Sequence, residues 1–143
     1  MQNRISLVTL GVADLEAARD FYARLGWQEH ARSQPTVAFY QINGAVFGLF
    51  GRDALAEDQG RAGTALGTGA STLAQNFSTE AEVDAAWQAA VDAGATPLKK
   101  PEKVFWGGYS GYWADPDGHV WEMAMNPFWP LDENGGITLP VPE

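Results

Sequence analysis

The sequence predicts an α+β fold built from two tandem βαβββ modules. Two observations support this prediction: the order strand, capped helix, strands occurs twice along the chain, and each helix is followed by a glycine. With 143 residues, 45% of them hydrophobic and 19% charged, the chain is long enough to bury a core as one domain. We place module one at about 4–51, a linker at 52–69, module two at about 70–125 and a tail at 126–143.

Module one begins with a strand over residues 4–12, which are mostly β-branched and aliphatic. Asp14 is a suitable cap for the following helix, whose apolar residues recur at spacings of three and four until Gly26 ends it. We expect further strands at about 27–32, 36–42 and 45–51, the last two joined by a turn at Asn43-Gly44.

Module two repeats this order, beginning with a strand over 70–78. Thr79 and Glu82 have the Thr-x-x-Glu spacing of a capping box, and Gly94 ends the helix that they begin. Strands are then expected near 95–99, 109–114 and 119–125, the last two joined by the turn Asp115-Pro116-Asp117-Gly118.

The two connecting segments have different compositions. The linker is rich in glycine, with one helical turn expected at 53–57. Four prolines exclude a long helix from the tail. Because the tail also carries Phe128, Trp129 and Leu131, we expect it to lie against the domain or a partner chain.

Composition excludes several function classes. The net charge is −9 and the cations are scattered, which argues against a nucleic-acid partner and favours a cationic ligand. No cysteine is present, so there is no disulfide framework and no cysteine-type zinc site. No apolar run is long enough to span a membrane, and the N-terminus lacks the apolar core of a signal peptide, so we expect a cytoplasmic protein.

The run from Phe105 to Pro130 combines many aromatic residues with one carboxylate, Glu122, in an apolar strand. That carboxylate has three interpretations: a structural hydrogen-bond acceptor, a salt-bridge partner of Arg4, or a general acid or base. Burial without a cation would favour the protonated form, which suits proton transfer at neutral pH. In the nearby loop, Trp106 and Tyr109 either surround the mouth of a pocket or only cover the core edge.

The first helix region carries the motif Asp14-Leu15, Phe21-Tyr22 and Leu25-Gly26, and the later Asp-Pro-Asp-Gly turn is followed by Glu122. With these two motifs the chain resembles members of the vicinal oxygen chelate superfamily. This is the fold of glyoxalase I, bleomycin-resistance proteins, fosfomycin-resistance enzymes and extradiol dioxygenases. The resemblance extends from Ile5 to Met125. It implies that the two modules form a curved mixed sheet around a cup, with the helices on the outer face.

The resemblance also implies four metal-ligand positions, which fall on Leu7, Gly48, Thr72 and Glu122. Only Glu122 is a natural ligand, whereas a bound divalent metal usually needs three or more. We expect the two histidines, His30 and His119, to lie at the surface. The prediction is therefore a member of the superfamily that lacks most metal ligands and has no metal site and no cofactor.

Strand alternation and the resemblance together predict the lining of the cup. The candidate ligand-binding residues are Leu7, Thr9, Phe50, Thr72, Asn76, Trp106, Tyr109, Tyr112 and Glu122. An apolar wall with a few polar groups favours metal-independent binding of a small hydrophobic or aromatic molecule. The alternative is a lyase or isomerase of glyoxalase type that uses Glu122 as acid, base or metal ligand. The resemblance further implies a homodimer.

Overall fold

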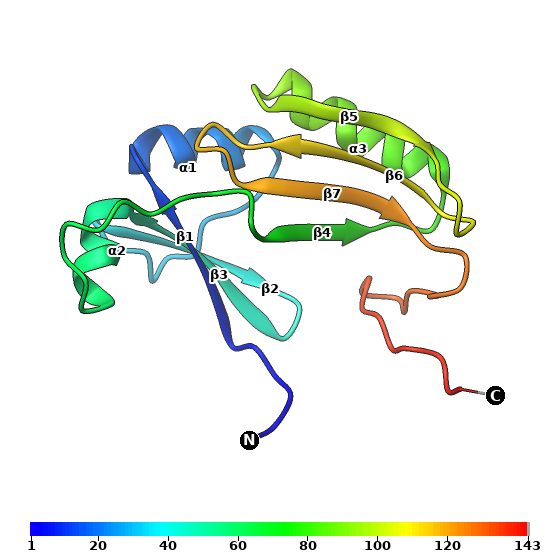
Figure 1. The fold of residues 1–143 in the computed structure, drawn as a ribbon, viewed down its shortest axis with the longest axis horizontal. Helices are drawn as coiled ribbons and strands as arrows, with labels where there is room; N and C mark the ends of the chain where they lie inside the picture. Colours follow the sequence, from blue (N-terminus) through cyan, green and yellow to red (C-terminus); the bar gives the residue numbers. More distant parts are fainter. Residues whose placement is uncertain (143) are drawn as a thin grey trace. The chain divides into compact units, whose positions relative to one another are not determined.

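The structure, a computed structural model, describes residues 1–142 and divides into two compact units, Met1–Thr68 and Gly69–Glu143 (Figure 1). Each unit holds a mixed β-sheet with at least one helix. The predicted α+β class is confirmed.

The first unit has a three-stranded sheet in the order β1-β3-β2. Strand β3 pairs in parallel with β1 and antiparallel with β2. In chain order its elements are β1 (Leu7–Val12), α1 (Leu15–Arg24), β2 (Val37–Ile42), β3 (Ala45–Gly51) and α2 (Arg52–Asp58).

Helix α1 begins and ends where the sequence predicts. The Asp14 carboxylate accepts a hydrogen bond from the Ala17 amide at 3.1 Å, and Gly26 adopts a φ of 91° just beyond the helix. The buried side of α1 carries Phe21 and Tyr22. The Tyr22 ring lies 5.3 Å from that of Phe47 on β3, so the helix is fixed to one face of the sheet by aromatic packing.

The strand predicted at 27–32 is wrong. This segment is irregular: the His30 amide donates to the Phe39 carbonyl of β2 at 2.7 Å, and the isolated bridge between Gln34 and Val37 lies beyond the segment. Residues 28–32 are exposed and mostly polar, so the segment buries little apolar surface that would hold a regular strand.

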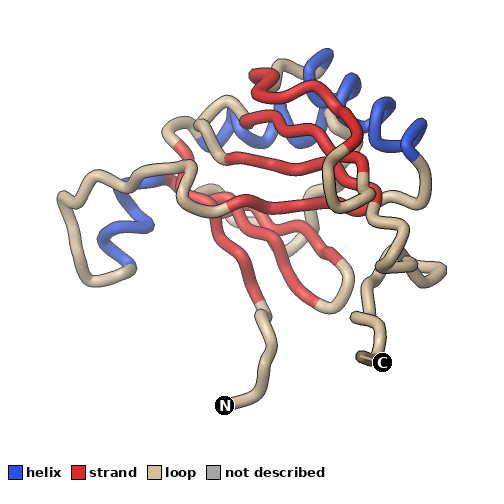
Figure 2. The backbone as a smooth tube through the Cα atoms, turned by 45° about the vertical axis from the view of Figure 1, so that its right-hand side comes forward, coloured by secondary structure: helices blue, strands red, loops and turns tan. Residues whose placement is uncertain are grey.

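The second unit has a four-stranded sheet in the order β4-β7-β6-β5, with α3 lying against one face (Figure 2). Its elements are β4 (Thr72–Asn76), α3 (Glu80–Asp92), β5 (Thr96–Lys103), β6 (Tyr109–Ala114) and β7 (Val120–Met125). The predicted cap is confirmed, because the Thr79 hydroxyl accepts from the Glu82 amide at 3.1 Å and donates to its carboxylate at 3.0 Å.

Packing beneath α3 centres on two tryptophans. Trp113 and Trp121 are nearly parallel, with ring centroids 5.5 Å apart, and both are buried. The Trp87 indole on α3 donates to the Tyr112 carbonyl at 3.0 Å, which ties the helix to β6. The opposite face of the sheet is not covered by a helix of this unit.

The Asp-Pro-Asp-Gly turn is held by its first residue. The Asp115 side chain is 3% exposed and accepts hydrogen bonds from the amides of Asp117 and His119, both at 2.9 Å. The motif therefore has a structural role, because it sets the register with which β6 enters β7.

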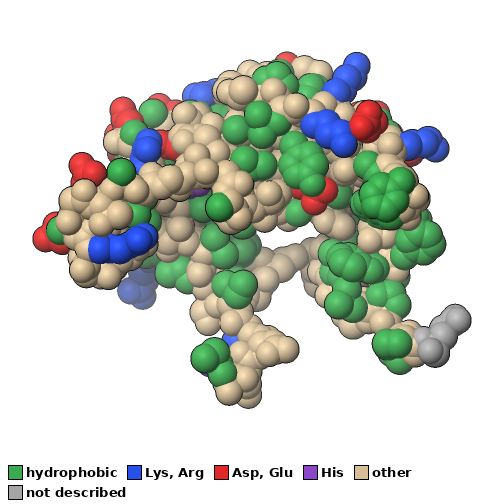
Figure 3. Space-filling view, in the orientation of Figure 1, with side chains coloured by type: hydrophobic (Ala, Val, Ile, Leu, Met, Phe, Trp, Pro, Cys, Tyr) green, Lys and Arg blue, Asp and Glu red, His purple; other side chains and the backbone are tan. Residues whose placement is uncertain are grey.

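The connecting segments differ from the expectation in one respect. The single turn expected at 53–57 is the seven-residue helix α2, which contacts β1 and β3 and buries Ala56. In the tail, the Phe128 ring lies against Gly107 of the loop before β6. Figure 3 shows hydrophobic side chains gathered over this end of the second unit, where Phe105, Trp106, Phe128 and Trp129 are exposed. None of the helices within residues 1–142 has the length and apolar character needed to cross a membrane.

Candidate functional site

The open face of the first sheet follows from the register of its strands. Leu7 pairs with Val46, and Phe39 pairs with Gly48, so these side chains point to the face opposite α1. A Cβ atom placed on Gly48 would lie 3.5 to 3.7 Å from side-chain atoms of Thr9, Leu7 and Phe39. The predicted residues Leu7 and Thr9 therefore share this face.

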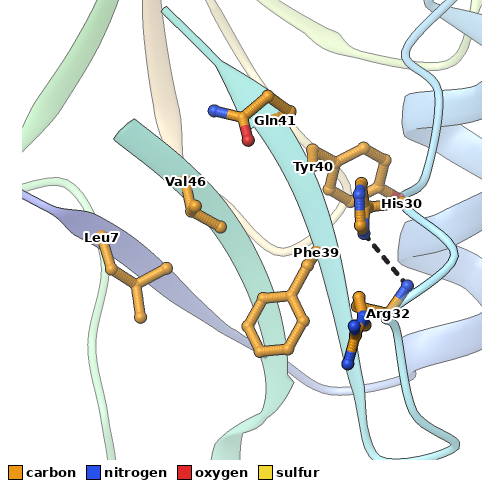
Figure 4. Close-up of a pocket in the computed structure, with 7 residues that line it drawn as sticks. All are labelled: Leu7, His30, Arg32, Phe39, Tyr40, Gln41 and Val46. Carbon is orange, nitrogen blue, oxygen red and sulfur yellow. Dashed lines mark hydrogen bonds between the residues drawn. The ribbon is translucent and has the colours of Figure 1, made fainter. Parts of the chain in front are cut away.

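A cavity of about 340 Å³ lies on this face at the side of β2 (Figure 4). Its apolar wall is formed by Leu7, Phe39 and Val46 from three neighbouring strands. The volume lies at the small end of the range typical of ligand sites, ~300–1,000 Å³. Of the nine predicted ligand-binding residues, Leu7 is the one that lines it.

The remaining side of the cavity comes from the loop before β2 and from β2 itself. His30 and Arg32 project from the loop, and Gln41 follows Phe39 on the strand. The Gln41 amide nitrogen donates to the carbonyls of Ile42 and Ala45, at 2.8 and 3.0 Å, so its oxygen remains as an acceptor. The cavity thus combines an apolar wall with a small set of polar groups, the usual composition of a small-molecule pocket.

Two hydrogen bonds near this loop determine which of its polar groups are left to contact a ligand. The His30 Nδ1 accepts from the Arg32 amide at 3.0 Å, so the neutral ring carries its proton on Nε2 and presents a donor there. Glu29 is bonded to the Arg19 guanidinium at 3.0 Å. The acidic neighbour of His30 is therefore already paired with a cation of α1.

Tyr40 also borders the cavity, although its ring packs on the α1 face of the sheet, with its centroid 6.3 Å from that of Tyr22. Its side chain is 2% exposed, and burial, with a smaller contribution from Glu29, raises its pKa from 10.0 to about 12. The phenol therefore stays protonated at neutral pH, and Tyr40 brings no charge to the cavity.

The open face of the second sheet carries a hydrogen-bonded pair. Tyr112 and Glu122 are directly opposite each other in the β6–β7 register, and the phenol donates to Glu122 Oε2 at 2.8 Å. Both side chains are half-buried. Burial, together with this bond and the charge of Glu122, raises the pKa of Tyr112. Alternation along the strand allows either Tyr112 or Trp113 to share a face with Glu122, and the β6–β7 register places Tyr112 there.

The register of β4 against β7 places Thr72 and Asn76 on the same face as Glu122. Ala74 is the residue directly opposite Glu122, so neither Thr72 nor Asn76 is its immediate cross-strand partner. Ser110 on β6, opposite Ala124, adds a second and buried hydroxyl, and Lys99 of β5 is the cross-strand partner of Tyr112. This face therefore combines the Tyr112–Glu122 pair with several other polar groups.

The remaining predicted residues lie elsewhere. Tyr109 is three residues from Tyr112 and points to the opposite, helix-covered face, where its hydroxyl donates to Asp84 on α3 at 2.6 Å. That bond, followed by burial, raises its pKa to about 12. We leave Tyr109 out of the proposed site. Trp106 lies over Gly108 in the loop before β6. Phe50 is opposite Gly11 and so falls on the same open face as Leu7 and Thr9, but at the end where α2 packs on Gly11 and outside the cavity lining.

The four positions that the sequence matched to metal ligands do not fit a divalent ion. Leu7 and Gly48 have no donor atom, Thr72 offers a hydroxyl, and Glu122 is engaged by Tyr112. Within residues 1–142, no group of three or more His, Cys, Asp or Glu side chains is arranged to hold a metal. We derive no chemistry that passes through a bound metal.

Besides Tyr40, sequence reasoning missed four residues of the cavity lining: His30, Arg32, Phe39 and Gln41. The last two could have been found, because the two-residue turn at Asn43-Gly44 pairs Gln41 with Val46 and Phe39 with Gly48 by counting outward. His30 and Arg32 carried no such signal, since the irregular loop that brings them to the cavity has no periodicity.

Comparison with known proteins places the chain among glyoxalase-like folds. The family model described as Glyoxalase/Bleomycin resistance protein/Dioxygenase superfamily matches residues 4–123. A glyoxalase-related enzyme from Fulvimarina pelagi is 37% identical, with 98% of this chain and 100% of that chain covered and a TM-score of 0.88. No curated protein matches the chain.

Two further solved structures are more distant. A glyoxalase/bleomycin resistance protein from Albidiferax ferrireducens is 27% identical, with 86% of this chain and 98% of that chain covered and a TM-score of 0.65. A lactoylglutathione lyase from Agrobacterium tumefaciens is 22% identical over 91% of this chain and 98% of that one, with a TM-score of 0.68, a likeness of fold alone.

Proposed function

We propose, from the premise that this chain belongs to the Glyoxalase/Bleomycin resistance protein/Dioxygenase superfamily, that it binds a small hydrophobic or aromatic molecule without a metal. The site is the cavity on the open face of the first sheet. The superfamily includes both binding proteins and enzymes, so the fold alone does not decide between them. The side chains at the cavity carry the proposal.

The single observation behind this proposal is the chemistry of the cavity wall. Leu7, Phe39 and Val46 form an apolar surface on which a ligand gains affinity by leaving water, at roughly 25 cal/mol per Å² of apolar area buried. None of the cavity's side chains is a carboxylate or thiolate, and its one imidazole already accepts a backbone hydrogen bond through Nδ1. The lining therefore favours binding by contact over coordination of a metal.

The test uses a neutral fluorescent probe, N-phenyl-1-naphthylamine, with protein treated with a chelator. We expect saturable binding that weakens about fivefold or more in Leu7→Gln and in Phe39→Ala, because each change removes apolar contact area. Leu98→Gln is the matched control, since Leu98 is an exposed leucine of β5 outside the cavity. Absence of saturable binding, or equal affinity in all four proteins, would overturn the proposal.

The alternative function is a lyase or isomerase of glyoxalase type, and the Tyr112–Glu122 pair favours it. A carboxylate that accepts a phenol hydrogen bond at 2.8 Å on an open sheet face can take a proton from a carbon next to a carbonyl, while the phenol shares the charge. The neighbour from Fulvimarina pelagi, which is described as a glyoxalase-related enzyme, adds support. Glu122 as a metal ligand is not part of this alternative, because its three companion positions lack suitable donors.

Proton transfer by Glu122 is tested by deuterium exchange. A panel of small α-hydroxy and α-keto carbonyl compounds is incubated in D₂O with protein, and loss of the α-proton is followed by NMR. Exchange above background that is lost in Glu122→Gln but retained in Glu133→Gln, an exposed glutamate of the tail, supports the enzyme. Exchange equal to background for the whole panel leaves the binding proposal as the account of this protein.

We keep the homodimer as a proposal for quaternary structure. Phe105 is 101% exposed and Phe128 is 62% exposed, and exposed aromatic side chains of this kind are candidates for a contact with a second copy of the chain. Sedimentation equilibrium at micromolar concentration is expected to return twice the mass of one chain, and a single-chain mass would refute it.

A further inference from the structure

We propose that the cavity on the first sheet selects a carboxylate-bearing apolar molecule, such as an aromatic carboxylic acid, with the carboxylate held at Arg32. This inference rests on the proposed binding function and adds the class of ligand. The net charge of the chain, −9, leads to the opposite expectation, a cationic ligand. The charge at the cavity has the opposite sign.

The main observation is the position of the Arg32 guanidinium. Arg32 lines the cavity, and within residues 1–142 no carboxylate forms an ion pair with it. Arg19 on the neighbouring helix shows the contrast, since it is bonded to Glu16, Glu29 and the Gln34 carbonyl. In a chain with 18 acidic and 9 basic residues, an arginine beside an apolar cavity that has no acidic partner is available for an anion.

A second donor lines the same cavity. His30 also lines the cavity, and its bond from the Arg32 amide leaves Nε2–H as the donating side of the ring. Figure 4 shows His30 and Arg32 entering from the same loop, with the apolar side chains on the strands beyond. A planar carboxylate has two oxygens and matches the paired N–H groups of a guanidinium, which a neutral hydroxyl does not.

The polar groups also determine the orientation of the ligand. The Gln41 amide nitrogen donates to two backbone carbonyls, so the group presents its oxygen to a ligand. That oxygen is an acceptor and would repel a carboxylate. The carboxylate therefore lies toward the loop, and the apolar body lies on Leu7, Phe39 and Val46. A cavity of about 340 Å³ admits a ligand of one or two rings.

The test compares three probes that share one apolar body. They are 2-naphthoate, 2-naphthylmethanol and 2-naphthylmethylammonium, titrated by protein-observed NMR so that affinity and position are measured together. We expect 2-naphthoate to bind about three- to fivefold more tightly than the alcohol, the gain typical of a solvent-exposed charge pair, and the ammonium to bind most weakly. The preference should shrink as salt is raised.

Three variants assign the effect to Arg32. Arg32→Gln should reduce the ratio of the 2-naphthoate affinity to the 2-naphthylmethanol affinity to about one. Arg32→Lys should retain most of the preference, because the charge remains. Arg61→Gln is the control of equal charge change, since Arg61 lies after α2 and is bonded to Gln59 outside the cavity.

The outcomes separate this inference from the function on which it rests. Equal affinity for all three probes, preference for the ammonium, or a preference that survives Arg32→Gln would overturn the inference and leave small-molecule binding intact. If none of the probes shifts the resonances of Leu7, Phe39 or Val46, the binding function itself fails.

Discussion

Two glycines should respond in opposite directions to the same substitution. A Cβ atom on Gly48 would meet Thr9 Oγ1, Leu7 Cδ1 and Phe39 Cδ1 at 3.5, 3.6 and 3.7 Å, which are ordinary contacts. Glycine within a strand costs roughly 0.5–1 kcal/mol relative to alanine. Gly48→Ala should therefore raise the free energy of unfolding by about that amount.

Gly111 presents the opposite case. A Cβ atom there would lie 2.7 Å from the Pro101 nitrogen and 2.8 Å from two of its ring carbons. These atoms belong to the backbone and ring of the neighbouring strand at a register irregularity, so they cannot rotate away. Overpacking of this kind costs about 1–3 kcal/mol, and we expect Gly111→Ala to lower the free energy of unfolding by that much.

Urea unfolding followed by far-UV circular dichroism measures both effects, with equal m-values required for the comparison. If the two units unfold separately, Gly48→Ala should move only the transition of the first unit and Gly111→Ala only that of the second. A fall of 1 kcal/mol or more in the free energy of unfolding of Gly48→Ala would contradict the space described around Gly48 on the open face of the first sheet. An unchanged Gly111→Ala would refute the described approach of β5 to β6.

Three further changes test the pairs and packing around the two sites. Glu122→Gln should lower the pKa of Tyr112, measured by ¹³C NMR of the tyrosine ring carbons, yet leave it above 10.0, because burial is the largest cause of its rise. The free energy of unfolding of the wild-type protein should fall between about pH 10 and pH 12, because native Tyr40 keeps its proton to about pH 12 while the unfolded chain releases it near 10.0. The fall due to Tyr40 approaches about 2–3 kcal/mol at the alkaline limit. Urea unfolding of Tyr40→Phe should lack this part of the fall. Trp121→Ala should cost about 3–5 kcal/mol in the same assay, whereas Trp129→Ala, at a side chain 41% exposed, should cost under about 1 kcal/mol; equal losses would contradict the stacked core.

The features that sequence predicted well are local ones. Each of them depends on residues close together in the sequence: the caps at Asp14 and Thr79, the helix ends at Gly26 and Gly94, and the turn held by Asp115. Such contacts are encoded in short windows, so their side-chain chemistry is visible before the fold is known.

The strand predicted at 27–32 shows where this approach stops. Its apolar start at Trp27 packs on Tyr40, with ring centroids 6.0 Å apart, but the residues that follow have no buried face. The sequence pattern did not distinguish a strand from an irregular loop that is held by scattered hydrogen bonds. The cavity residues His30 and Arg32 belong to that loop, so the error in secondary structure also concealed the polar side of the site.

Tyr109 shows how counting along a strand could have refined the prediction. From the sequence it was placed with Trp106 in the loop at the pocket mouth, yet it begins β6, where residues an odd number apart point to opposite faces. The structure places Tyr109 beside Asp84 and Tyr112 beside Glu122. Counting along β6 would have separated them without any coordinates.

The central claim is that the open face of the first sheet binds a small apolar molecule without a metal. Its most direct test is a set of intermolecular nuclear Overhauser effects between 2-naphthylmethanol and isotope-labelled protein kept in chelator. The account predicts contacts from the naphthyl protons to the methyl groups of Leu7 and Val46 and to the Phe39 ring. Contacts confined to residues of the second unit, or none until a divalent metal is added, would contradict it.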